Sequence, residues 1–320
     1  MSRARLLKLL ASTALVLCAS YFFYRAFQRN WASIEQHQFE LEPGYLLAAA
    51  LAVLATSLLG TLAWSTSINA LSTARIGFRQ SVAAVNASGL TKYIPGKIWS
   101  YALQMYWLGG LGFSKSVIVY INLMNLAISL GTSLIVGLAC LSISSVPLPL
   151  SVRLGSLFGL LLLDACAILF NRALVNSAIQ LFNRIFRRNL AYFRVEPSML
   201  VRLHLIHALA AVASGFGAYA FCLAIGYRLT LDRGLIVVGS TLVADVAGFL
   251  AVIVPGGIGV REGVMYAMLG GATTGSLAIV MPVASRLLNM AIDVLLGAVA
   301  FRLLRTLTEK SPPPQEQSAA

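Results

Sequence analysis

The residues best suited to chemistry lie at a break in an apolar part of the chain. Pro255 and the glycines that follow it, up to Gly259, interrupt this part, and two opposite charges, Arg261 and Glu262, come directly after. Proline removes a backbone donor, and glycine allows backbone conformations that a regular helix excludes. In a bilayer, broken backbone is tolerated only where protein or a water-filled cavity covers it, and ionisable residues at that depth are functional candidates. We therefore expect a ligand to contact the protein here.

An anionic group is the ligand that this break favours. Gly256 and Gly257 would leave free N–H groups at the start of a half-helix, where the partial positive charge suits a phosphate. Arg261 adds a planar, permanently charged donor. Glu262 and Asp245 either pair with arginines, face a cationic head group or relay protons. A purely structural Arg261–Glu262 pair is the alternative.

A second polar set lies on one face of the last apolar segment. Arg286, Asn289 and Asp293 are spaced i, i+3 and i+7, so a helix places them on one side. Asn122 and Asn125 mark a similar stripe in an earlier segment. For the charged set we favour a hydrophilic cavity between the two halves of the chain. For the asparagines we favour hydrogen bonding between helices.

The break has a counterpart 160 residues earlier. Pro95 and Gly96 match the later Pro-Gly pair, and seven of the 21 positions in 90–110 equal those in 250–270. This predicts an internal repeat, as in many transporters. Two unrelated kinked helices are the alternative. Lys97 stands where the second copy has a glycine, so it would act as a point charge and the two copies are not equivalent.

Composition places the chain in a membrane. Residues of hydrophobic type make up 58% of the sequence and charged residues 11%, and the mean hydropathy is +0.82. No Walker loop or nucleophile–base arrangement is present. The cysteines have no CxxC spacing, and His204 and His207 have no third ligand nearby in the sequence, so we expect no cofactor and no metal site.

The apolar segments predict an all-α fold of two inverted repeats. Spans are expected at 6–27, 45–70, 116–143, 153–175, 201–227 and 275–305. The segments 80–110 and 235–272 are broken in the middle, and we interpret them as re-entrant hairpins, although 235–254 is long enough to cross. The predicted units are a first repeat at 1–160, a second at 161–310 and a disordered tail at 311–320. Three crossings in each half require the halves to be inverted.

The charges give an orientation. The net charge is +13. With the N-terminus inside, lysine and arginine favour the cytoplasmic side about three to one, as the positive-inside rule expects. This accounts for the basic character without nucleic acid, and it predicts that both termini are cytoplasmic.

These motifs resemble the transmembrane region of lysylphosphatidylglycerol synthases. The resemblance is carried by the segment from Pro255 to Glu262 and by the segment from Lys92 to Trp99, and it covers nearly the whole chain. It implies a flippase-like protein of the bacterial inner membrane. In two-part members a separate soluble domain makes the aminoacylated lipid. That domain is missing from this sequence, so we expect a transporter and no aminoacyl transfer.

The leading hypothesis is a flippase that moves the head group of a phospholipid or a lipid-linked sugar through a groove between the repeats. Membrane lipids would be its partners, and the oligomeric state stays open, with a homodimer as one option. One alternative is an ion-coupled transporter of a small anion, and another is a non-transporting partner of an envelope lipid or polysaccharide synthesis complex. A membrane-embedded transferase would need an acidic cluster in a loop, and the loops are short and mostly basic.

Overall fold

The computed structural model describes residues 25, 28, 31–36, 39–93, 99–146, 149–169, 180, 184, 195–251, 257 and 259–308. Within these ranges the chain consists of helices and their connections, without strands. The predicted all-α fold is therefore confirmed for this part of the chain. The tips of both predicted hairpins, 94–98 and 252–256, and the predicted tail lie outside the described residues.

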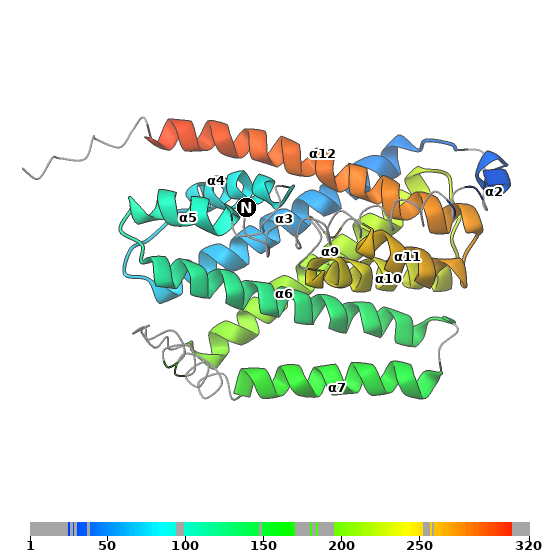
Figure 1. The fold of residues 1–320 in the computed structure, drawn as a ribbon, viewed down its shortest axis with the longest axis horizontal. Coiled ribbons are helices and arrows are strands. Elements are labelled where there is room, and N and C mark those ends of the chain that lie inside the picture. Colours follow the sequence, from blue (N-terminus) through cyan, green and yellow to red (C-terminus); the bar gives the residue numbers. More distant parts are fainter. Residues whose placement is uncertain are drawn as a thin grey trace, which may run out of the picture.

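Long apolar helices make up most of the molecule (Figure 1). Among the described residues, five helices are long and apolar enough to cross a membrane, and they are α3 (Pro43–Leu71), α6 (Lys115–Ile143), α9 (Pro197–Ala224), α10 (Leu231–Leu250) and α12 (Gly275–Thr308). Four of them coincide with predicted spans. The predicted span 153–175 begins as α7 (Leu150–Leu169), and the span 6–27 lies almost wholly outside the described residues.

Both predicted hairpins are broken helices. The first consists of α4 (Phe78–Gly89), the 3₁₀ turn η1 (Leu90–Tyr93) and α5 (Trp99–Gly109), and the second of α10 and α11 (Val260–Gly270). At 1.5 Å per residue, α4, α5 and α11 are each under about 20 Å long, too short for a ~30 Å hydrocarbon core. The 20 residues of α10 are enough to cross. A short helix α2 (Trp31–Glu35) precedes α3.

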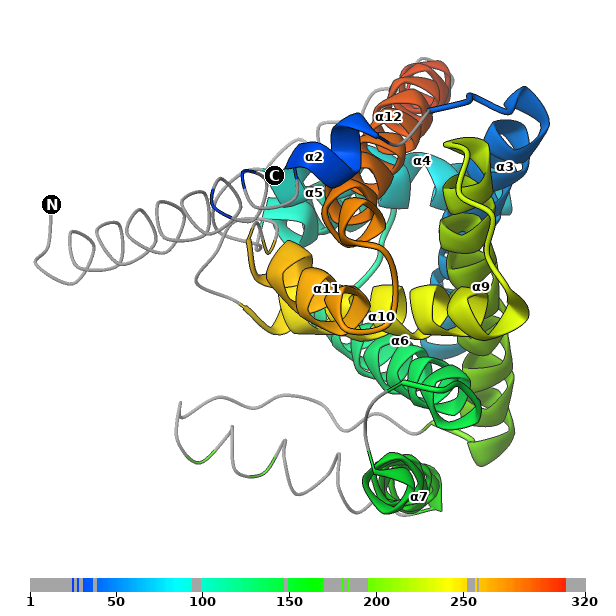
Figure 2. The ribbon, with the colours of Figure 1, turned by 90° about the vertical axis from the view of Figure 1, so that its right-hand side faces the viewer.

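The helices of the two halves interlock. α3 packs along α9, as Figure 2 shows at one edge of the molecule. α6 of the first half packs on α10 of the second, and α12 of the second half packs on α4 of the first. Adding 160 to α4 and α6 gives the positions of α10 and α12, so these two contacts are counterparts of each other.

Chain directions accord with inversion. In Figure 1, α6 runs from left to right along the colour scale and α12 runs from right to left. The α4–α5 hairpin lies towards the left end and the α10–α11 hairpin towards the right. An inverted repeat requires such a pattern, and it stays the interpretation that we favour.

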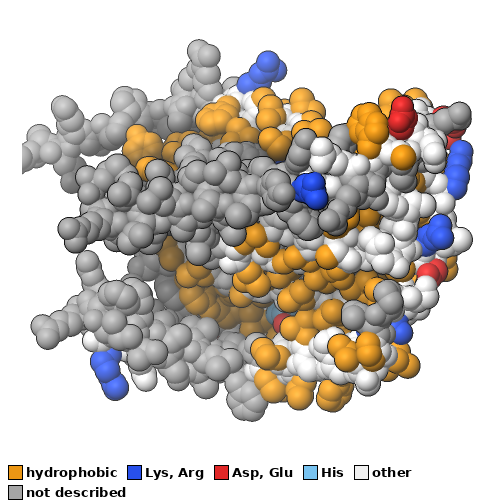
Figure 3. Space-filling view, turned by 45° about the vertical axis from the view of Figure 1, so that its right-hand side comes forward, with side chains coloured by type: hydrophobic (Ala, Val, Ile, Leu, Met, Phe, Trp, Pro, Cys, Tyr) orange, Lys and Arg blue, Asp and Glu red, His pale blue; other side chains and the backbone are white. Residues whose placement is uncertain are grey.

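Glycines allow the closest helix contacts. A Cβ at Gly239 of α10 would lie 2.8 Å from the Gly137 carbonyl oxygen of α6, and a Cβ at Gly217 of α9 would lie 3.2 Å from the Cβ of Ala52 in α3. Small residues of this kind bring membrane helices together where lipid provides no hydrophobic driving force. Apolar side chains cover much of the face in Figure 3, and the described charges on it gather mainly near its right-hand edge.

Candidate functional site

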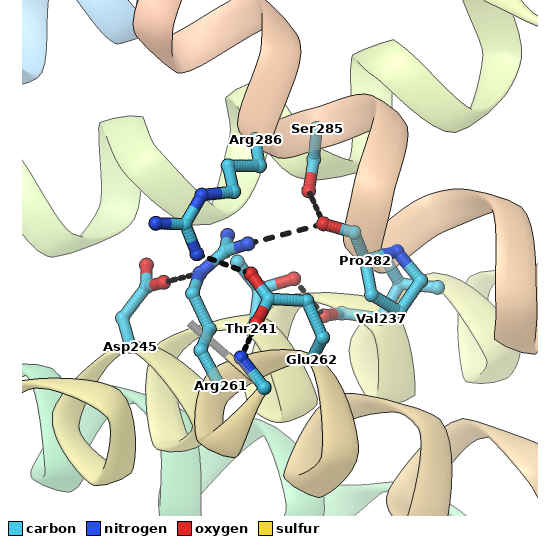
Figure 4. A network of polar contacts seen from close by, with 9 residues as sticks. Val237, Thr241, Asp245, Arg261, Glu262, Pro282, Ser285 and Arg286 are labelled. Carbon is cyan, nitrogen blue, oxygen red and sulfur yellow. Dashed lines mark hydrogen bonds and ion pairs between the residues drawn. The ribbon is translucent and has the colours of Figure 1, made fainter. Parts of the chain in front are cut away.

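Four charged residues predicted from the sequence meet where α10, α11 and α12 converge (Figure 4). Arg261 of α11 forms an ion pair through Nε with Asp245 of α10. Arg286 of α12 donates to Glu262 of α11, with 2.5 Å between Nη1 and Oε1. The sequence left open which acid pairs with which arginine. The structure places the neighbours Arg261 and Glu262 in two separate pairs.

Glu262 also closes the start of α11. Its Oε2 accepts the backbone N–H of Gly259, the residue that caps the helix, at 2.6 Å. Gly259 has φ +86°, a conformation that glycine adopts without steric cost. The N–H groups predicted to face an anion are those of Gly256 and Gly257; the N–H of Gly259 is instead bonded to the protein's own carboxylate.

Glycines hold the tip of the second hairpin against α10. Gly257 has φ +66°, and a Cβ there would lie 2.3 Å from the carbonyl oxygen of Gly248. A Cβ at Gly248 would itself lie 2.8 Å from the Cβ of Arg261. Because this contact leaves no room for side chains, it sets the separation of α10 and α11 and so brings Arg261 to Asp245.

One nitrogen of the Arg261 guanidinium has no partner. The residue is 8% exposed, and its Nη1 donates to the carbonyl oxygen of Pro282 at 3.2 Å. Its Nη2 is buried and has no hydrogen-bond partner among the described residues. A buried N–H without an acceptor costs free energy, so this donor is suited to a water or a ligand oxygen.

A small cavity adjoins Arg261. Its volume is about 20 Å³, enough for a water molecule. The lining comes from α3, α9, α10, α11 and α12, and its polar members are Ser214, Thr241, Arg261, Ser285 and Asn289. The second half of the chain therefore supplies most of the lining, and the first half contributes Val53 of α3. The groove between the repeats stays a prediction.

The other predicted site residues fall into two groups. Asn289 reaches the cavity, and Asp293 lies one further turn along α12, half-buried. Pro95, Gly96, Lys97, Pro255 and Gly256 lie outside the described residues.

The first half of the chain has a neutral network at the positions found by subtracting 160. Gln104 of α5 donates to the hydroxyl of Ser88 in α4 at 2.9 Å and accepts from the amide of Asn122 in α6 at 2.7 Å. Adding 160 turns Ser88 and Asn122 into Gly248 and Pro282, which both contact Arg261. The same helix junction is thus amide-bonded in one half and ionic in the other.

Sequence reasoning missed the contribution of Pro282. A proline inside α12 breaks the backbone ladder of a spanning helix, and a carbonyl near such a break can accept from a side chain. The side chain of Arg261 and the hydroxyl of Ser285, at 3.4 Å, both point to this carbonyl oxygen. The proline within the predicted span 275–305 was the signal that could have identified it.

Comparison with known proteins decides the family. The model of the lysylphosphatidylglycerol synthase transmembrane region matches residues 5–297. The chain belongs to this family. It is thus a multi-pass membrane protein related to lipid handling, as the resemblance in the sequence predicts. No curated protein and no solved structure matches the chain.

Proposed function

We propose that this protein is a lipid flippase of the bacterial inner membrane, with both termini in the cytoplasm. It moves the head group of a phospholipid or lipid-linked sugar between the two halves of the chain while the hydrocarbon tails stay in the bilayer. The observation that carries the proposal is the buried Nη2 of Arg261, which has no partner among the described residues and lies beside a cavity that the second half and Val53 of the first half line. Membership of a lipid-related family supports it.

Arg261 is the residue that contacts the head group. Its Nη2 donates to a phosphate or hydroxyl oxygen, a task for which guanidinium is well suited. The ion pair with Asp245 keeps the charge compensated when no lipid is present. Because the cavity of about 20 Å³ admits only water, the head group passes after α11 and α12 separate.

The other charged residues prepare the path. Glu262 holds Arg286 and the start of α11 at once, so the helix end and the second arginine move together. Asn289 adds a polar contact in the cavity. Movement of the lipid is downhill or coupled to an ion.

The test is exchange of head groups between leaflets of liposomes that contain the protein. Three labelled lipids with anionic, neutral and cationic head groups are compared for wild type, Arg261→Met, and Arg261→Met with Asp245→Asn. The single variant leaves Asp245 without its partner, so it loses both stability and exchange. The double variant removes both charges, so it regains stability but not exchange.

Arg228→Ala is the matched control, because Arg228 pairs with Glu42 at an exposed position outside the site. It should exchange lipid at the wild-type rate. If the double variant also exchanges lipid at that rate, Arg261 only ties helices together. Movement of a small soluble anion by the wild type, without movement of any lipid, would contradict the flippase proposal and favour an anion transporter.

A further inference from the structure

A second set of titratable groups lies apart from the arginine site, between α7 and α9. Asp164 of α7 and His204 of α9 approach to 3.1 Å, from Oδ1 to Nε2. The two side chains are 22% and 15% exposed, so both are largely screened by protein. Burying ionisable residues inside a membrane protein costs free energy, so residues at such positions are candidates for a function.

The hydrogen bonds of His204 fix where its protons lie. Its Nδ1 is 2.7 Å from the carbonyl oxygen of Leu200, which can only accept, so Nδ1 carries a proton. The opposite nitrogen faces the Asp164 carboxyl group at 3.1 Å. That contact is attractive only if a further proton lies between Nε2 and Oδ1, on either group. The pair therefore holds one proton more than a neutral imidazole beside a carboxylate.

Loss of that proton breaks one of the two contacts. With Nδ1 still donating to Leu200, a bare Nε2 lone pair would face a carboxylate. With the proton moved to Nε2, a bare Nδ1 would face the carbonyl oxygen. Either arrangement sets two acceptors against each other at hydrogen-bond distance, so the pair as it stands is a one-proton site.

Residues of α6 and α9 surround the pair. A Cβ at Gly131 of α6 would lie 3.6 Å from Oδ1 of Asp164, which is an ordinary contact distance, so α6 packs against the acid. His207, one turn further along α9, donates from Nε2 to Oδ1 of Asn125 at 3.1 Å and is buried. Its neutral form suffices for this bond.

The other charged residues on α6, α7 and α9 lie towards the ends of these helices. On α7 and α6 these are Arg153 and Lys115, 11 and 16 residues from Asp164 and Gly131 respectively. On α9 the charged neighbour is Arg202, which is exposed. α3 contributes the hydroxyl of Ser67, which accepts from Asn125 at 2.8 Å. On α10 and α12 the charges are Asp232, Arg233, Asp245, Arg286, Asp293, Arg302 and Arg305.

The pair lies near the start of α9, one of the helices that line the cavity. His204 lies seven residues into α9, about 10 Å along its axis. Further along, α9 carries Ser214 and Gly217, which line the cavity beside Arg261. A change in the contact between α7 and α9 can therefore shift α9, which forms one side of that cavity.

We propose that Asp164 and His204 form the proton-binding site that couples proton movement to head-group movement. The inference rests on the proposed function for its second half, since coupling needs a transported cargo. One proton is bound per pair. Binding keeps α7 docked through His204, and release weakens that contact.

Two measurements test it. The first is a pH titration of ¹⁵N-labelled histidine by NMR in nanodiscs, which reads protonation without transport. In wild type, Nε2 of His204 gains a proton, or a hydrogen bond from protonated Asp164, as the pH falls, and in Asp164→Asn this change is absent over the same pH range. His37→Gln and His207→Gln identify the other two ring signals. If Nε2 of His204 in wild type shows neither a bound proton nor a hydrogen bond from Asp164 at any pH, the site does not exist.

The second measurement is head-group exchange in liposomes with a pH difference of one unit across the membrane. One coupled proton shifts the equilibrium distribution of the lipid by up to about tenfold. Asp164→Asn and His204→Gln should abolish this shift while keeping exchange, and Arg228→Ala should retain it.

The two failures are distinguishable. If the wild type exchanges lipid but the pH difference does not shift the lipid distribution, proton coupling is wrong and the flippase proposal stands. A wild type that moves no lipid, together with a normal NMR titration, overturns the flippase and leaves the proton-binding site.

Discussion

At the scale of the residue, Arg261 owes its position to glycines that have no side chain. Gly257 lies against the backbone of Gly248, and Gly248 lies against Arg261 itself. The pairing with Asp245 is therefore a result of backbone contact more than of charge attraction. Charges alone would also allow Arg261 to approach Glu262 or Arg286 to approach Asp245.

Gly257→Ala should lower stability and exchange together. The substitution forces a Cβ to within 2.3 Å of a backbone oxygen at a positive φ, which we expect to cost about 1–3 kcal/mol. Thermal unfolding in detergent and lipid exchange measure the two effects.

Gly263→Ala is the matched control on α11, because nothing lies within 4 Å of a Cβ there. Alanine favours helix, so this variant should equal wild type or gain up to about 1 kcal/mol. Equal stability of Gly257→Ala and wild type would mean that the hairpin tip does not rest on α10 in the working protein.

The charged residues of the site were identifiable from the sequence, but their pairing was not. Arg261, Glu262, Asp245 and Arg286 stand out because charges are rare in apolar segments. Their partners depend on how closely α10 approaches α11. That distance is set by the contact between Gly248 and Gly257, which no pattern in the sequence reveals. The Asp164–His204 pair was hidden for the same reason, since it joins two helices that are 40 residues apart.

At the scale of the element, the interlocking of α6 with α10 depends on one narrow contact. Gly239→Ala places a Cβ 2.5 Å from Cγ of Leu141 and 2.8 Å from the Gly137 oxygen. Backbone cannot yield as a side chain can, so we expect a loss of about 1–3 kcal/mol. Thermal unfolding checks it, with Gly155→Ala on α7 as the control because its Cβ would meet nothing within 4 Å. If both variants melt alike, α6 and α10 are farther apart than described.

Element lengths were predictable where composition decides them. The spans at α3, α6, α9 and α12 follow from apolar runs long enough for a bilayer. The hairpins were harder to predict, because a half-helix that enters the membrane and a short helix that crosses it have the same composition. α10 illustrates this, since its 20 residues meet the requirement for a full crossing although it belongs to a predicted hairpin.

At the scale of the whole molecule, inversion of the halves makes a prediction about sidedness. In a variant whose four native cysteines are replaced by serine or alanine, a single cysteine is placed at Arg75, between α3 and α4, or at Arg228, between α9 and α10. A membrane-impermeant thiol reagent should label Arg228→Cys from outside the cell and Arg75→Cys only after the membrane is opened. Reversed labelling would contradict the orientation, and labelling of both from one side would contradict the inverted topology.

The exchange of partners between halves also has a consequence for biosynthesis. Gly137 of α6 is synthesised about 100 residues before Gly239, its contact in α10, and α4 likewise precedes α12. At 5–20 residues per second, α6 waits roughly 5–20 s for its partner. During that interval the first half, still attached to the ribosome, exposes Gly137. It also exposes the Ser88 hydroxyl and the amides of Gln104 and Asn122 before the second half has packed. The insertion machinery, not the finished fold, must then keep this half from pairing with other nascent helices.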